Sequence, residues 1–178
     1  MAALRALRLL DTEPEERFDR LARLAASALG VPTCQISFVD ADRQWVKARV
    51  GSDVVEVPLH RSMSAMVLDA GLLVVPDMRT DARFAEHPRV IGDPYHRFFA
   101  GCAIHGPAGE VVGALSVFDD RPREVDESQV QLLRDVAALV DDELSRSSVD
   151  DLLDEARVTQ QRTREMLDTL VEGLVYQG

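Results

Sequence analysis

The chain has 178 residues, of which 46% are hydrophobic, and a formal net charge of −11 at pH 7. This length and hydrophobic content fit one packed domain with an appended element, whereas two globular domains would be a tight fit. The acidic charge argues against a nucleic-acid partner, because binding to phosphates needs basic patches.

Membrane insertion and a structural role for cysteine are both disfavoured. No apolar run approaches the ~20 residues that span a bilayer, and the residues after Met1 lack a signal-peptide pattern, so we expect a cytoplasmic protein without a membrane partner. Cys34 and Cys102 each lie in an apolar run, which predicts two buried thiols and gives no support to a disulfide framework or a zinc site. An unusual redox role is the alternative for these thiols.

The N-terminal part predicts two helices. Ala2–Leu10 is short and helix-prone. Thr12 is a candidate N-cap for a second helix, with Pro14 in its first turn and Gly30 as its C-cap. Its apolar positions recur at helical spacing. They are Phe18, Leu21, Leu24, Ala25 and Leu29, with Ala28 beside the stripe.

Alternating and β-branched residues predict an antiparallel sheet in the middle of the chain. Val31–Asp40 and Arg43–Val50 form an expected hairpin around Asp40–Asp42, with Trp45 near the middle of its second strand. Further short strands are expected at Ser52–Leu59 and Leu72–Val75. A second hairpin joins Phe98–Ile104 to Glu110–Asp119 through a Gly-Pro-Ala-Gly turn.

Two segments between these strands are candidates for ligand contact. Ser62–Ala70 predicts a brief helix with Met63, Met66 and Val67 on one side, ended by Gly71. Met78–Arg97 has little periodicity, and its prolines limit any helix to a turn or two. A connection of this length is often a binding loop or a lid.

A long helix is expected from Asp126, with Gln129 completing a capping box. Its apolar stripe has a mean spacing of about 3.7 residues, which is typical of a nearly straight helix that pairs with a partner helix. We expect a parallel homodimer, the alternative being a monomer whose tail frays after Arg146. The expected dimer residues are Leu133, Ala137, Val140, Leu144, Leu152, Ala156 and Leu167.

This region also carries much of the negative charge. Between Asp126 and Glu155 there are ten acidic residues and two arginines, a net charge of −8. We interpret the run as a solvated helix face, with an acidic docking surface as the alternative.

Many short stretches, in order and at matching spacing over Leu9–Leu144, resemble the GAF domains of bacterial signalling proteins. They are Leu10-Asp11-Thr12, Pro14–Asp19, Leu29–Pro32, Ile36-Ser37, Val39-Asp40, Asp42–Trp45, Val74–Asp77, Asp81–Phe84, Arg97–Gly101 and Gly113–Val117. The resemblance implies an α+β fold with a central antiparallel sheet, helices on both faces and a long C-terminal signalling helix. It places the first and last helices on one face and a pocket on the other.

The resemblance also divides the chain. It implies an N-terminal helical lead over residues 1–12, a GAF domain over 13–147 and a coiled-coil-like linker helix over 148–169. Met166–Val175 is similar to the opening of a PAS domain, which implies that residues 170–178 begin a covalently linked downstream signalling domain.

The chain departs from its relatives in the short pocket helix. Many of them read Ser-Phe-Cys-x-His where this sequence has Ser62-Met63-Ser64-Ala65-Met66, without the thiol and the imidazole. Neither Cys34 nor Cys102 has a neighbouring His or basic cluster that would favour a thiolate. We therefore expect no enzymatic activity and no covalent bilin, and the sequence requires no cofactor.

The candidate pocket combines apolar and polar side chains, as small-molecule sites usually do. Its expected members are Trp45, Ser62, Met63, Ser64, Met66, Asp77, Phe84, Arg97, Phe98 and Phe99. Core packing is the alternative for the aromatic and methionine residues. Arg97 is expected to bind a carboxylate or phosphate, or else to pair with Asp77 or Asp81.

The four histidines are scattered without the spacing of a metal site. His60 and His96 border the expected pocket, where they could ligate haem iron or contact an anion. The leading hypothesis is a dimeric sensory domain that relays small-molecule or partner binding to an output domain of unknown activity. The alternatives are a ligand-free dimerisation scaffold and a haem or redox sensor. Cyclic nucleotides and other small anions are candidate ligands. The acidic charge of the chain and the lack of a phosphate-binding glycine loop argue against them.

Overall fold

The computed structural model describes residue 4 and residues 7–175, with side chains to Leu167. It divides into two compact units, Met1–Leu144 and Ser145–Gly178. Much of the helix expected at Ala2–Leu10 lies outside the described residues, and Leu7 and Arg8 form a turn. Residues 176–178, at the end of the expected further domain, also lie outside them.

The first unit is built on a six-stranded antiparallel sheet in the order β3-β2-β1-β6-β5-β4. Both predicted hairpins are present, and they pair with each other through β1 and β6. The α+β fold expected from the sequence is therefore confirmed. The strands are β1 (Thr33–Val39), β2 (Arg43–Val50), β3 (Glu56–Pro58), β4 (Leu72–Val75), β5 (Phe98–His105) and β6 (Val111–Asp119).

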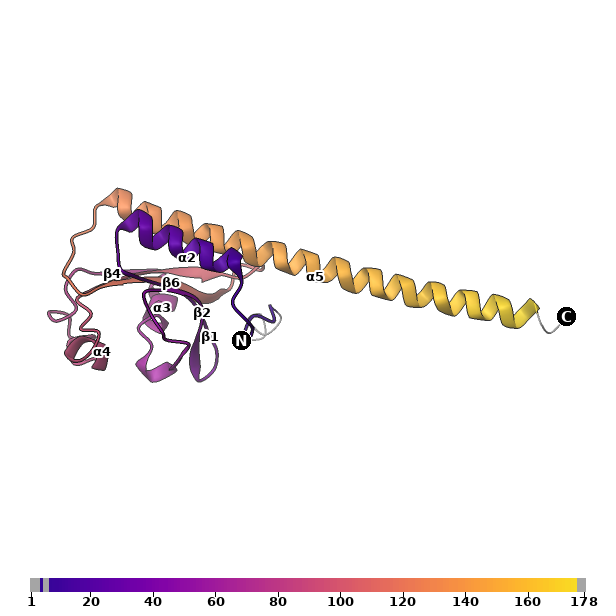
Figure 1. Ribbon diagram of the computed structural model, residues 1–178, viewed down its shortest axis with the longest axis horizontal. Helices are drawn as coiled ribbons and strands as arrows, with labels where there is room; N and C mark the ends of the chain where they lie inside the picture. Colours follow the sequence, from indigo (N-terminus) through magenta and orange to yellow (C-terminus); the bar gives the residue numbers. More distant parts are fainter. Residues whose placement is uncertain (1–3, 5–6, 176–178) are drawn as a thin grey trace. The chain divides into compact units, whose positions relative to one another are not determined.

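Helices α2 (Glu16–Leu29) and α5 (Glu127–Val175) lie side by side over one face of the sheet within this unit (Figure 1). Gly30 ends α2 in the left-handed conformation at φ 63°, as predicted. The N-cap of α2 is Glu15, not Thr12, whose hydroxyl donates to the carbonyl of Leu9 instead. Leu24, expected on the buried stripe, is 45% exposed, because Ala22 and Ala26 face the sheet in its place.

A bulge in β2 leaves Lys47 as an extra residue, since Ser37 pairs with Val46 and Ile36 with Ala48. The Lys47 side chain is fully buried and forms an ion pair of 2.7 Å with Glu15. It also donates to the carbonyl of Glu13 at 2.8 Å. This buried ammonium attaches the segment before α2 to the sheet.

The opposite face of the sheet carries short elements. They are the 3-10 turn η1 (Leu59–Arg61), α3 (Ala65–Ala70) and α4 (Pro88–Ile91). The long connection from Met78 to Arg97 contains only the short helix α4, as its prolines predicted. Beneath these elements a second core contains Phe84, Phe99 and Phe118. A Cβ on Gly101 would lie 2.6 Å from Val67, so this glycine allows α3 to approach the sheet closely.

Helix α5 begins with the predicted capping box. Asp126 Oδ1 accepts the N–H of Gln129 at 2.9 Å, and Gln129 Oε1 accepts the N–H of Asp126 at 3.1 Å. In the second unit α5 is helical to Val175, and its described side chains beyond Ser148 are exposed.

The expected dimer stripe is corrected over its first half. Leu133, Ala137, Val140 and Leu144 are at most 2% exposed and belong to the core between α5 and the sheet, so they are not available to a partner helix. Leu152, Ala156 and Leu167 are exposed, and their role in dimerisation stays a prediction.

None of the helices in the described part of the chain combines the length and the apolar character that a bilayer span requires.

Candidate functional site

A small cavity lies on the sheet face opposite α2, under η1 and the loop that contains α4. Its volume is about 30 Å³, above the ~10–15 Å³ that a single water requires. Its lining combines several polar side chains with a few apolar ones. These residues are Gln35, Gln44, Val54, Val57, Arg61, Met63, Ser64, His87, Arg89, His96 and Phe118.

Two amides from adjacent strands form the sheet side of this cavity. Gln35 on β1 donates to the Ser52 hydroxyl at 3.0 Å. Gln44 on β2 is 3% exposed, and its carbonyl oxygen accepts from Ser62. No other residue in the described part of the chain accepts from the Gln44 amide nitrogen, so its two N–H groups are left for a ligand or water.

His87 connects the two arginines that line the cavity. Its Nδ1 accepts the backbone N–H of Arg89 at 3.1 Å, and its Nε2 lies 3.1 Å from the carbonyl of Arg61. Because a carbonyl oxygen only accepts, this arrangement places the donated ring proton on Nε2. The ring therefore joins η1 to α4 and holds both backbones at one end of the cavity.

His96 forms another wall of the cavity and is 6% exposed. Its ring stacks on Phe118 with centroids 4.6 Å apart. Burial lowers the pKa of His96 to about 4, and the nearby positive charge of Arg89 acts in the same direction. The imidazole is therefore neutral at physiological pH.

An open groove adjoins the cavity. It has a volume of about 300 Å³ and shares Arg89 and His96 with the cavity, so these two side chains stand between the two spaces. Asp53 and Asp93 line the groove but not the cavity. Negative side chains are thus confined to the outer space.

Part of the predicted pocket is brought together here. Met63 and Ser64 line the cavity, and Ser62 binds Gln44 within it. The Ser64 hydroxyl lies 2.9 Å from that of Ser116 on β6. Phe84 and Phe99 pack in the core beneath, with ring centroids 5.8 Å apart.

The remaining predicted pocket residues lie elsewhere, which corrects their expected placement. Trp45 pairs with Phe38 across β1 and β2, so it lies on the helix-covered face. Phe98 also faces the helices, because it is adjacent to Phe99 in β5 and alternates with it. Met66 is 41% exposed on the outside of α3.

The two charged candidates do not pair with each other either. Asp77 forms an ion pair with Arg79 at 2.7 Å, and Arg97 donates to the carbonyl of Val90 at 2.8 Å. Asp81 pairs with Arg83. Arg97 is therefore held by backbone oxygen, and neither expected carboxylate partner binds it.

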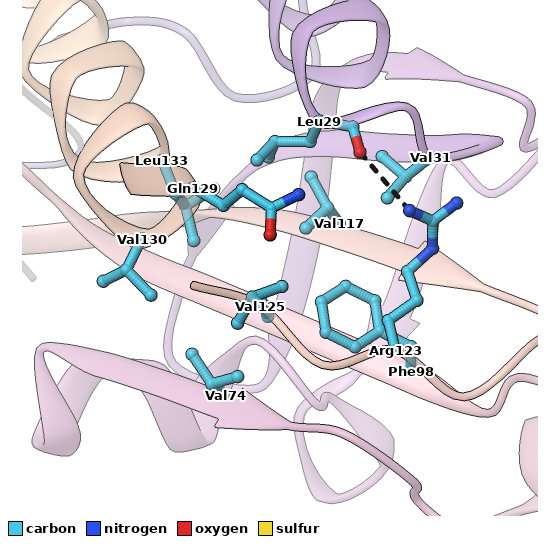
Figure 2. Close-up of a pocket in the computed structure, with 11 residues that line it drawn as sticks. Leu29, Val31, Val74, Phe98, Val117, Arg123, Val125, Gln129, Val130 and Leu133 are labelled. Carbon is cyan, nitrogen blue, oxygen red and sulfur yellow. Dashed lines mark hydrogen bonds between the residues drawn. The ribbon is translucent and has the colours of Figure 1, made fainter. Parts of the chain in front are cut away.

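Figure 2 shows a second, apolar hollow on the helix side of the sheet. Phe98, Val117, Val125 and Leu133 line it, and the Arg123 guanidinium reaches the carbonyl of Leu29 at its edge (Figure 2). Its volume is about 10 Å³, at the lower limit for a single water. We interpret it as a packing gap between the sheet and α5.

The cysteines and histidines do not form a reactive cluster. Cys34 is fully buried on the helix-covered face, and burial raises the pKa of its thiol to about 12. Burial also raises the pKa of the half-buried Cys102. Among the described residues, no three His, Cys, Asp or Glu side chains gather as a metal site would require. His60, one of the two histidines expected at the pocket, is exposed in η1 and does not line the cavity.

Five polar or charged residues of the cavity were not predicted from the sequence. They are Gln35, Gln44, Arg61, His87 and Arg89. One signal was available for Gln35, because it is a polar residue that alternates with Cys34 and Ile36 in an otherwise apolar strand.

Comparison with known protein families identifies the family to which this fold belongs. The family model for the GAF domain matches residues 13–144. The chain belongs to the GAF domain family, as its sequence motifs predicted.

A cyclic di-GMP phosphodiesterase of Pseudomonas aeruginosa is 35% identical to this chain over 136 residues. The match covers 75% of this chain, and the chain spans only 23% of that relative's length.

Two solved structures illustrate the range of the fold. The GAF domain of an Acinetobacter phosphoenolpyruvate-protein phosphotransferase has a TM-score of 0.61 at 20% identity, covering 84% of this chain and 92% of that one. Free methionine-R-sulfoxide reductase from Neisseria meningitidis, solved with its substrate, has a TM-score of 0.62 at 15% identity, covering 84% and 89%. At these identities the likeness is one of fold alone.

Proposed function

We propose that this chain is a cytoplasmic regulatory domain of a bacterial signalling protein. A small molecule binds over the sheet face that carries α3 and α4, and its effect reaches an output domain of a longer polypeptide through α5. One observation carries this proposal most strongly: polar side chains with unused hydrogen-bonding groups, among them Gln44 and His96, surround one cavity. Small-molecule sites combine apolar side chains with a few polar groups of this kind, which favours a site built for a ligand over one built for packing.

The sheet gives the cavity a short route to α5. Phe118 lines the cavity, while Val117 beside it in β6 packs into the core under α5. Asp141 on α5 accepts the backbone N–H of His105 at the end of β5 at 2.8 Å. A ligand acts through these contacts only if it binds two arrangements of the sheet and helix with different affinity.

Dimerisation through the second half of α5 is the other part of the proposal. Val149, Leu152, Ala156 and Leu167 are exposed at successive steps of three, four and eleven residues, which suits an apolar seam between two helices. A helix of this kind is marginal alone in water, so a second copy of the chain supplies the missing contacts.

The proposed domain regulates rather than catalyses. A thiolate is the reactive form of cysteine, and burial disfavours it at both Cys34 and Cys102. Assay of the purified chain with free methionine sulfoxide and a thiol reductant tests this directly; we expect no turnover above the protein-free reaction.

Filling the cavity tests the ligand part of the proposal. Val57→Phe adds a ring at a residue that lines the cavity, and Val55→Phe is the matched control two residues away at a position that is 40% exposed. Amide spectra of the wild type, recorded with a panel of small molecules, are expected to reveal compounds that shift both cavity and 127–144 resonances. Val57→Phe should abolish these shifts and Val55→Phe should keep them. Shifts that persist in Val57→Phe would contradict the proposal.

A further inference from the structure

We propose that the ligand of this cavity carries one anionic group, a carboxylate or a phosphate, which binds between Arg61 and Arg89. This inference rests on the proposed function and names the chemical class of its ligand.

The charges around the cavity differ in sign from those of the chain as a whole. The net charge of the chain is −11, yet the side chains lining the cavity include two arginines and no Asp or Glu. Elsewhere, Arg43 pairs with Asp11 and Arg79 with Asp77. Neither the Arg61 nor the Arg89 guanidinium contacts a carboxylate in the part of the chain that the structure describes, so both remain available to an anion.

The backbones of the two arginines are held in place before any ligand binds. His87 bonds to the backbone of each of them at 3.1 Å, across 26 residues of sequence in the case of Arg61. Such fixed backbones reduce the ordering that binding requires. Guanidinium groups suit this task because they bind carboxylates and phosphates through two parallel hydrogen bonds.

The neutral groups of the cavity complete the set of donors. Ser62 occupies the carbonyl oxygen of Gln44, which leaves the amide N–H groups of this 3% exposed side chain to donate. His96 is a second buried polar side chain, and no other described residue bonds to its ring. Neutral donors such as the Gln44 amide can bond to the oxygens of the same anionic group that the arginines bind, so the ligand needs no second negative charge.

The outer groove restricts the rest of the ligand. Asp53 and Asp93 line it, so a second anionic group placed there would be repelled. A ligand with a neutral or cationic remainder fits this distribution better than a polyanion does. The groove volume of about 300 Å³ reaches the lower end of small-molecule sites, and Arg89 and His96 must separate for a ligand to occupy both spaces.

Titration with defined probes tests the inference. Acetate, glycine, inorganic phosphate and pyrophosphate are compared with neutral acetamide at constant ionic strength, by amide and imidazole spectra. We expect acetate or phosphate to bind saturably. The ratio of their affinities shows whether the site prefers a carboxylate or a phosphate. Pyrophosphate and acetamide should bind at least about tenfold more weakly. An anion beside His96 should also raise the pKa of this imidazole from about 4.

Charge-removing variants complete the test. Arg61→Gln and Arg89→Gln are each expected to weaken binding of the preferred anion by about tenfold or more, and Arg121→Gln, at an exposed position away from the cavity, should leave it unchanged. Equal binding of acetamide, or undiminished binding to Arg89→Gln, would overturn the inference. If a neutral compound binds and Val57→Phe blocks it, the anion inference fails while the proposed function stands. If Val57→Phe blocks no ligand, the proposed function fails as well.

Discussion

Asp141 on α5 binds His105 at the end of β5 through both of its carboxylate oxygens. One accepts the backbone N–H of His105 at 2.8 Å, and the other lies 3.2 Å from His105 Nδ1. The half-buried position of Asp141 raises the pKa of its carboxyl group, against the opposing effect of these hydrogen bonds. The contact fixes α5 to a strand that also contributes Phe99 to the core beneath the cavity.

Removing this contact is expected to loosen α5 from the sheet. Asp141→Ala should lower the free energy of unfolding by about 1–2 kcal/mol, because the His105 N–H loses its acceptor. Asp141→Asn keeps an acceptor oxygen and should cost less. Urea unfolding of the three proteins measures the difference, and equal stabilities of the Ala and Asn variants would contradict this role.

The lowered pKa of the buried His96 imidazole should make the folded protein less stable in mild acid. Below about pH 6.5 the unfolded chain binds a proton at this imidazole, whereas the folded chain does so only near pH 4. The free energy of unfolding should therefore fall as the pH decreases through this window, by at most about 1.4 kcal/mol per pH unit.

The measurement compares urea unfolding of the wild type and His96→Gln between about pH 6.5 and 5. This range lies above the window of Asp77 and Asp81, whose pKa values are lowered by Arg79 and Arg83 and whose contributions are lost only in stronger acid. The variant should show the shallower dependence. An unchanged slope would mean that His96 is not responsible.

Assembly through α5 is tested by charge insertion. Leu152→Glu should convert a dimer into monomers, because it places carboxylates within the proposed apolar seam. Val158→Glu is the matched control: Val158 is 51% exposed on the same helix and lies off the stripe that contains Leu152 and Ala156. Sedimentation equilibrium gives the masses. A dimer that survives Leu152→Glu, or a wild type that is monomeric at all concentrations, would refute the seam.

Thiol labelling tests the environment of the two cysteines. Cys34 should react with a thiol reagent only as fast as the protein unfolds, because it is inaccessible and its pKa is about 12. The half-buried Cys102 should react faster than Cys34 but more slowly than a thiol in the denatured chain. Cys34→Ala and Cys102→Ala assign the two rates, and rapid labelling of Cys34 would contradict its burial.

The sheet was predictable because its strands are short, alternating and separated by turn residues. The face of the sheet to which each side chain points was harder to predict. Phe98 and Phe99 are adjacent, so only one of them can face the cavity, and composition does not say which. Trp45 was also predicted on the wrong face. Its direction is set by its pairing with Phe38 and by the bulge at Lys47, which composition does not reveal.

The apolar stripe of α5 was correctly predicted as helical. Its first half was predicted to pack against a partner helix, whereas it packs against the sheet. The same spacing runs through Val140 and Leu152, although the sheet buries the former and the latter is exposed. The cavity was the least predictable feature. Arg61 and Arg89 line the same cavity, and the contact of His87 with the Arg61 carbonyl spans 26 residues, which local pattern does not encode.

Native mass spectrometry tests the central claim, that the cavity holds a small molecule, most directly. The purified chain is measured under gentle and denaturing conditions, with the Arg61→Gln/Arg89→Gln double variant alongside and with the probe anions added where no ligand is retained. We predict a reproducible non-covalent mass that is present only under gentle conditions and is lost in the double variant. An additional mass of equal occupancy in the double variant would contradict the account, as would a wild type that stays bare with every probe.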